Sequence, residues 1–93
     1  MTDEEKIHRA KEAENILNHP MVVAALADME KICLEALVQC DIDKPDVERR
    51  YVESLRCVRQ FKHRLQEHID TGKLAVANQE RASLFQRIRK KVA

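Results

Sequence analysis

The scarcity of glycine and proline is the feature that most limits what this chain can fold into. One glycine, Gly72, and two prolines, Pro20 and Pro45, occur among 93 residues, so few tight turns are possible. A charged fraction of 35% points in the same direction, and the 3% of aromatic residues leaves aliphatic side chains to form the core. We therefore predict an all-α fold in a single helical domain over residues 1–93.

Helix-start and helix-stop signals divide the sequence into four predicted helices. Thr2 and Glu5 have the spacing of a capping box, which places the first helix at about 3–18. The residue before a proline disfavours helical geometry and proline favours a first helical position, so Pro20 opens a second helix over about 20–40. Pro45 opens a third over 45–71 by the same rule, and a fourth is expected over 74–91.

The pair Gly72-Lys73 admits two interpretations. Phosphate-binding loops contain Gly-Lys, but they need several glycines between a strand and a helix, and no strand is visible in this sequence. Gly72 instead follows the apolar residue Ile69 at the distance of a left-handed glycine that ends a helix, and Leu74 is placed for the accompanying hydrophobic contact. We predict that Gly72 caps the third helix.

Apolar residues recur at helical spacing and leave hydrophobic surface to spare. Alternating steps of three and four in the second and third helices predict an antiparallel hairpin between them. The second helix carries apolar residues beyond that stripe, and the fourth helix has an apolar face that the hairpin does not bury. We therefore predict an oligomeric bundle, with the chain itself as a partner. The predicted protein-interface residues are Val23, Ile32, Leu37, Leu84, Phe85, Ile88 and Val92.

Charge is distributed unevenly along the chain. Residues 1–42 carry nine acidic and four basic side chains, whereas residues 71–93 carry six basic side chains and one acidic. This polarity favours contacts between copies or an acidic partner. A basic helix end also suits its own dipole, and the same charges make contacts with nucleic-acid phosphates possible. The possible nucleic-acid contacts are Arg81, Arg87, Arg89, Lys90 and Lys91.

Residue patterns typical of catalysis or metal binding are weak. The cysteines Cys33, Cys40 and Cys57 are odd in number and form no CxxC motif, which argues against a disulfide framework and a structural zinc. His63 and His68 are five residues apart, which is off the spacing that places two ligands on one helix face. We predict no catalytic residue, no metal and no cofactor. No apolar run reaches membrane-spanning length, so we expect no membrane partner.

Several short motifs together resemble a group of small all-helical accessory proteins of tailed bacteriophages. The similarity covers about residues 10–77. It rests on Ala13, Ile16-Leu17-x-x-Pro20, Leu26, Asp46-x-Glu48-Arg49 and Leu65-x-x-x-Ile69-x-Thr71-Gly72-Lys73-Leu74-Ala75. Members of that group are short virion or assembly components without an established activity. The resemblance implies a location in the host cytoplasm or the virion.

These observations predict a non-enzymatic protein that acts through helix–helix contacts. The first hypothesis is a phage assembly or virion adaptor whose partners are itself and another phage or host protein. The second is a small nucleic-acid-binding or DNA-packaging factor that uses the basic C-terminal helix. The third is an inhibitor that binds a host protein.

Overall fold

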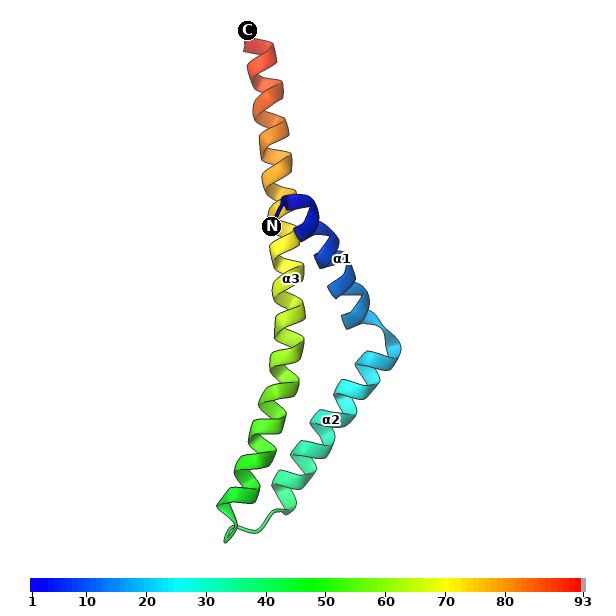
Figure 1. Ribbon diagram of the computed structural model, residues 1–93, viewed down its shortest axis with the longest axis vertical. Helices are drawn as coiled ribbons and strands as arrows, with labels where there is room; N and C mark the ends of the chain where they lie inside the picture. Colours follow the sequence, from blue (N-terminus) through cyan, green and yellow to red (C-terminus); the bar gives the residue numbers. More distant parts are fainter. Residues whose placement is uncertain (93) are drawn as a thin grey trace. The chain divides into compact units, whose positions relative to one another are not determined.

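The protein is all-helical throughout the part described by the computed structural model, residues 1–92 (Figure 1). Within that range it contains three helices and no strand: α1 spans Asp3–Asn18, α2 spans Pro20–Gln39 and α3 spans Pro45–Val92. The two prolines each stand at the first residue of a helix, where the missing N–H has no helical partner to lose.

The N-terminal ends of α1 and α2 are both capped by the side chain of the preceding residue. The hydroxyl Oγ1 of Thr2 accepts a hydrogen bond from the backbone N–H of Glu5 at 3.2 Å. His19 has extended backbone geometry, and its ring nitrogen Nδ1 accepts from the backbone N–H of Met21 at 3.2 Å. These contacts satisfy N–H groups that a helix leaves without intrahelical partners.

The loop between α2 and α3 is short and held by backbone hydrogen bonds. Cys40 leaves the helical region at the end of α2. The N–H of Lys44 donates to the carbonyl oxygen of Asp41 at 3.0 Å, and the carbonyl oxygen of Lys44 accepts from the N–H of Val47 at 3.2 Å. The chain therefore turns tightly before Pro45 without any glycine.

The predicted helix end at Gly72 is wrong, and so is the separate helix predicted over 74–91. The α3 helix continues through this point, and Gly72 does not have a positive φ. The residues that follow, Leu74 to Gln79, include no helix breaker, so the helix has no local reason to stop. Gly72 is buried inside the helix, where a neighbouring helix needs the space that a side chain would fill.

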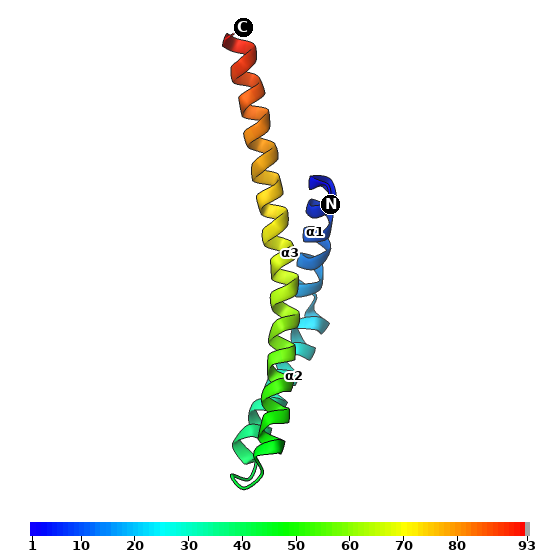
Figure 2. The same ribbon diagram turned by 60° about the vertical axis from the view of Figure 1, so that its left-hand side comes forward.

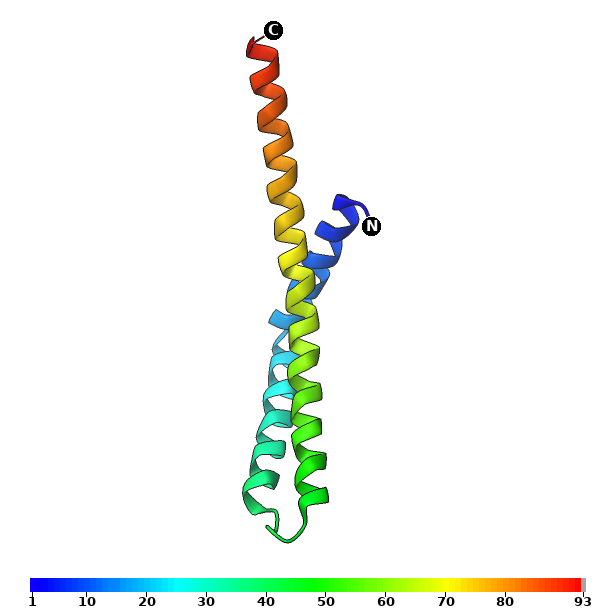
Figure 3. The same ribbon diagram turned by 90° about the vertical axis from the view of Figure 1, so that its left-hand side faces the viewer.

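Residue contacts divide the chain into two compact units, each of which has its own small core. The second unit, Ile16–Arg64, contains α2 and the first part of α3, which run antiparallel beside each other (Figure 2). Its buried side chains are Leu26, Cys33, Leu55 and Val58. The first unit joins Met1–Asn15 to residues 65–92 of α3 (Figure 3). Its buried side chains are Ala13, Ile69 and Ala75.

Candidate protein-binding surface

Small residues bring α1 and α3 into close contact in the first unit. Gly72 faces α1 so directly that a β-carbon added to it would overlap with the β-carbon of Ala10. Ala13 and Ala75 are each almost fully buried in the same unit. Helices approach this closely only where the facing side chains are short, so the sequence of small residues fixes which side of α3 is covered by α1.

The opposite side of α3 carries an apolar stripe that no part of the first unit covers. At ~100° per residue, the side chains of Leu74, Ile88 and Val92 lie about half a turn around the helix from Gly72. We call this surface the C-terminal stripe. It consists of Leu74, Ala77, Arg81, Leu84, Phe85, Ile88 and Val92.

Large side chains of the C-terminal stripe are in contact with water. All residues from 76 to 92 are exposed. Leu84 is 57% exposed, Phe85 58%, Ile88 48% and Val92 82%. A run of exposed large apolar side chains along one helix face is typical of a docking surface, whereas single exposed apolar residues are ordinary. These four residues are the ones predicted from the sequence for the C-terminal interface, and the structure brings them to one face.

The basic residues of the same segment gather only in part: Arg87, Lys90 and Lys91 lie within about 100° of one another around the helix, whereas Arg81 and Arg89 lie outside that arc. Arg81 lies within the C-terminal stripe, whereas Lys90 lies about half a turn away, on the side of Gly72. Arg87 and Lys91 border one edge of the stripe and Arg89 lies near the other. A helix that follows a phosphate backbone presents its cations on a common face, an arrangement that Arg81 and Arg89 do not share.

The predicted interface residues of α2 do not form one surface. Val23 is 52% exposed and Ile32 62% exposed, but nine residues separate them, which places them on opposite sides of the helix at ~100° per residue. Leu37 is half-buried and lies on the side of α2 that faces α3. The sequence therefore identified exposed apolar residues on α2 without identifying a shared face.

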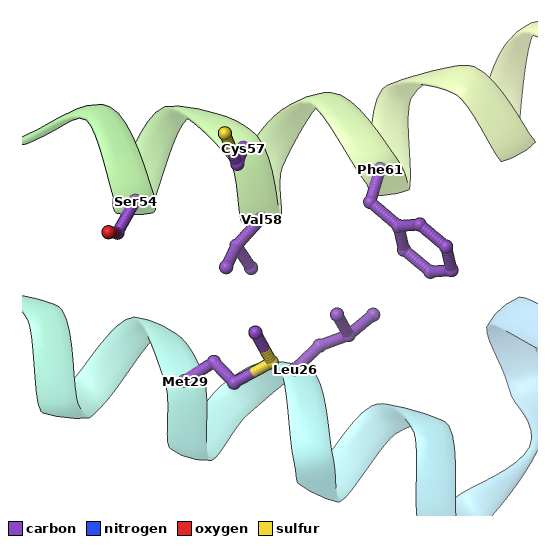
Figure 4. Close-up of a pocket in the computed structure, with 6 residues that line it drawn as sticks. All are labelled: Leu26, Met29, Ser54, Cys57, Val58 and Phe61. Atoms are coloured by element: carbon purple, nitrogen blue, oxygen red, sulfur yellow. The ribbon is translucent and has the colours of Figure 1, made fainter.

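An open apolar groove lies between α2 and α3 in the second unit, and the sequence did not predict it. Its volume is about 490 Å³. The side chains of Val58 and Phe61 point towards Leu26 and Met29 across the two helices (Figure 4). Phe61 and Met29 remain about half exposed, because only two helices are present to cover them. The sequence contains one hint of this groove: both Phe61 and Lys62 fit the helical spacing of the apolar residues in this part of α3.

Lys62 forms an ion pair with Glu30 across the two helices of the second unit. Its Nζ donates to Oε1 of Glu30 at 2.7 Å and joins α3 to α2 within the second unit. That hydrogen bond is the largest influence and lowers the pKa of Glu30; desolvation opposes it, and the positive charges of Lys62 and Arg59 add smaller effects in the lowering direction.

Features that would point to other classes of function are few in the described residues. Residues 1–92 contain no group of three or more His, Cys, Asp or Glu side chains arranged to hold a metal ion. Over the same range, no helix combines the length and the apolar character needed to cross a membrane. No family model, curated protein or solved structure matches this chain.

Proposed function

We propose that this protein is a non-enzymatic adaptor that binds other proteins by helix–helix contact through the C-terminal stripe. The observation that carries the proposal is the exposure of Leu84, Phe85, Ile88 and Val92 along one face of α3. Each such side chain contributes about 1.5–3 kcal/mol when it is fully buried, which gives the stripe a substantial tendency to be covered. The resemblance to small phage accessory proteins supports an assembly or virion setting for the adaptor.

The amphipathic character of the segment supports docking in preference to a purely solvated tail. A solvated helix end needs only polar side chains, whereas this one carries apolar residues at 74, 77, 84, 88 and 92, a helical repeat that only Arg81 interrupts. Such a face is recognised by a groove or by another helix with its own apolar stripe. The basic residues at the edges of the stripe set the orientation of the bound partner by attracting its acidic side chains.

The proposal is tested by placing a photo-crosslinking amino acid at the centre of the stripe. Phe85 is replaced by p-benzoylphenylalanine, and the protein is irradiated in bacterial cells that produce it. We expect adducts with protein, and the same label at Ser83, on the opposite side of the helix, should give far fewer. Adducts at Phe85 should also disappear when Leu84→Asp and Ile88→Asp are added.

A matched pair of substitutions controls for charge and helix propensity. Ser83→Asp with Gln86→Asp introduces the same two carboxylates away from the stripe and should leave the adducts unchanged. Adducts with nucleic acid alone, or no adducts at either position, would overturn the proposal. Retention on duplex DNA that falls steeply with salt and is lost in Arg87→Glu with Lys90→Glu would favour a nucleic-acid-binding protein instead.

A further inference from the structure

The edge of the C-terminal stripe carries a self-complementary pair of charges. Glu80 is the only acidic residue between 74 and 92, and Arg87 follows it seven residues later on the same edge of the stripe. Both side chains are exposed, and no ion pair of either is found among residues 1–92. About 10 Å of helix separates them, so they cannot pair with each other inside one chain. Each is available to a partner of opposite charge.

We propose that the occupant of the C-terminal stripe is the same stripe of a second copy, running antiparallel, with Glu80 of each copy facing Arg87 of the other. The inference rests on the proposed function and names the partner. Positions 74, 77, 81, 84 and 88 alternate in steps of three and four, as the core positions of a coiled coil do; four of them are apolar, and Arg81 is the charged exception near the two-fold axis. In an antiparallel pair centred between Arg81 and Leu84, Ala77 of one copy packs against Ile88 of the other.

The same register brings the edge residues together without further adjustment. Glu80 directly precedes the core position Arg81, and Arg87 directly precedes the core position Ile88. In an antiparallel coiled coil, edge residues at these positions of the two copies face each other, so Glu80 of each copy faces Arg87 of the other. The axis repeats the contact, so two ion pairs form at once. Of the alignments that the apolar positions allow, the one that packs Ala77 against Ile88 is therefore also the one that pairs Glu80 with Arg87.

An antiparallel arrangement is favoured over a parallel one by the distribution of charge. Arg87, Arg89, Lys90 and Lys91 would lie beside their own copies in a parallel pair, and like charges at that distance repel. In the antiparallel pair this basic end lies beside residues 74–79, which carry no charge. The helix dipoles also oppose each other in that arrangement.

The first unit leaves room for this contact. The α1 helix packs at Gly72 and Ala75, about half a turn around α3 from the C-terminal stripe, so it does not cover the face that a second copy would use. The stripe spans about 18 residues, or roughly 27 Å of helix. A two-helix contact of that length is short for a coiled coil, so we expect a dimer that dissociates on dilution.

The register is tested by exchanging the two charges and measuring dimerisation by sedimentation equilibrium. Glu80→Arg alone and Arg87→Glu alone each place like charges in contact twice, and each should weaken dimerisation about tenfold. The double variant Glu80→Arg with Arg87→Glu has the net charge of the original chain and restores both pairs. It should therefore recover most of the original affinity. Circular dichroism on each variant establishes that the helix content is unchanged.

A second measurement reports orientation directly. The native cysteines are replaced by alanine, and a spin label is attached at Ser83→Cys or at Lys90→Cys. Both labels lie on the outer faces of the antiparallel pair: the two labels at position 83 are at nearly the same height along the axis, whereas those at position 90 are offset by roughly 20 Å more along it, so the distance at position 90 is the longer one. In a parallel pair the two positions would give similar distances.

The outcomes separate this inference from the proposed function. A purified protein that remains a single chain up to millimolar concentration overturns the antiparallel dimer, and so does a double charge exchange as weak as the single ones. Photo-crosslinks from Phe85 to other proteins would in that case still support the adaptor, with a foreign helix as its partner. A dimer that is unaffected by either single exchange also overturns the register.

Discussion

Gly72 of α3 lies against Ala10 of α1, and the missing side chain of Gly72 is what allows the two helices to approach this closely. A β-carbon at position 72 would overlap with that of Ala10 and come within 3.2 Å of the carbonyl oxygen of Lys6. Neither neighbour is the end of a flexible side chain, so the contact cannot adjust locally. The only glycine of the chain therefore serves helix packing.

Gly72→Ala should loosen the contact between α1 and α3. In an isolated helix, alanine is about 1 kcal/mol more favourable than glycine, so the substitution would stabilise α3 if packing were unimportant. We expect the opposite, because the added methyl group pushes α1 away from α3. Hydrogen exchange of the α1 amides should accelerate, and the thermal midpoint should fall.

Ala10→Gly provides the control for that substitution. By itself it removes a methyl group from α1 and should destabilise the chain by about 1 kcal/mol. Combined with Gly72→Ala it removes the overlap, so the double variant should show slower α1 exchange than Gly72→Ala alone. Additive losses in the two variants would mean that residues 10 and 72 do not meet.

The ion pair between Glu30 and Lys62 should make the stability of the second unit depend on pH. The pKa of Glu30 is lowered from its ordinary value of 4.5 in the folded chain. A carboxyl group with a lowered folded pKa contributes stability above its unfolded pKa, and the contribution is lost as pH falls through the folded pKa. Glu30→Gln should therefore lower the thermal midpoint at pH 7 and have progressively less effect below pH 4.5.

Glu35 offers a matched control for this pH dependence. Its carboxylate lies 3.9 Å from Nζ of Lys31 on the same helix and is well exposed. Exposed pairs of this kind contribute about 0.3–0.5 kcal/mol. Glu35→Gln should thus change the thermal midpoint much less than Glu30→Gln at pH 7. Equal effects of the two substitutions would show that the contact between helices adds nothing to stability.

Local signals in the sequence were sufficient to predict where the helices begin. Thr2, Pro20 and Pro45 each start a helix through interactions with residues no more than a few positions away. A short stretch of sequence therefore contains all the residues that take part. The apolar face around Leu84 also follows from periodicity alone, and the structure shows that it is exposed. The expected all-α class is shown by the structure.

Features that depend on residues distant in sequence were not predictable in the same way. Gly72 has the sequence neighbourhood of a helix cap, and only the position of Ala10, 62 residues earlier, makes it an internal packing residue. The pair Glu30–Lys62 and the apolar groove beside it likewise depend on how α2 and α3 are aligned. A single sequence contains no measure of that alignment.

His19 should be required for the stability of the first turn of α2. Its Nδ1 accepts the N–H of Met21 at 3.2 Å, which is the role that Ser, Thr, Asp and Asn usually fill at this position. His19→Ala removes the acceptor and should cost about 1 kcal/mol of unfolding free energy, measured by urea denaturation. His19→Asp supplies a stronger acceptor and should be neutral or stabilising. A loss of similar size in both variants would rule out capping as the role of the ring.

The free cysteines should report separately on the groove and on unfolding of the second unit. Cys57 is exposed at the apolar groove, whereas Cys33 is buried between α2 and α3. A water-soluble thiol reagent should therefore modify Cys57 rapidly and Cys33 only as fast as the unit opens. Because Cys40 is also partly exposed, the experiment is made with Cys40 replaced by serine, and in that background Cys57→Ser should remove the rapid phase and leave the slow one. Protection of Cys57 that increases with protein concentration would place a second copy over the groove as well, whereas a rapid phase that persists in Cys57→Ser would contradict the burial of Cys33.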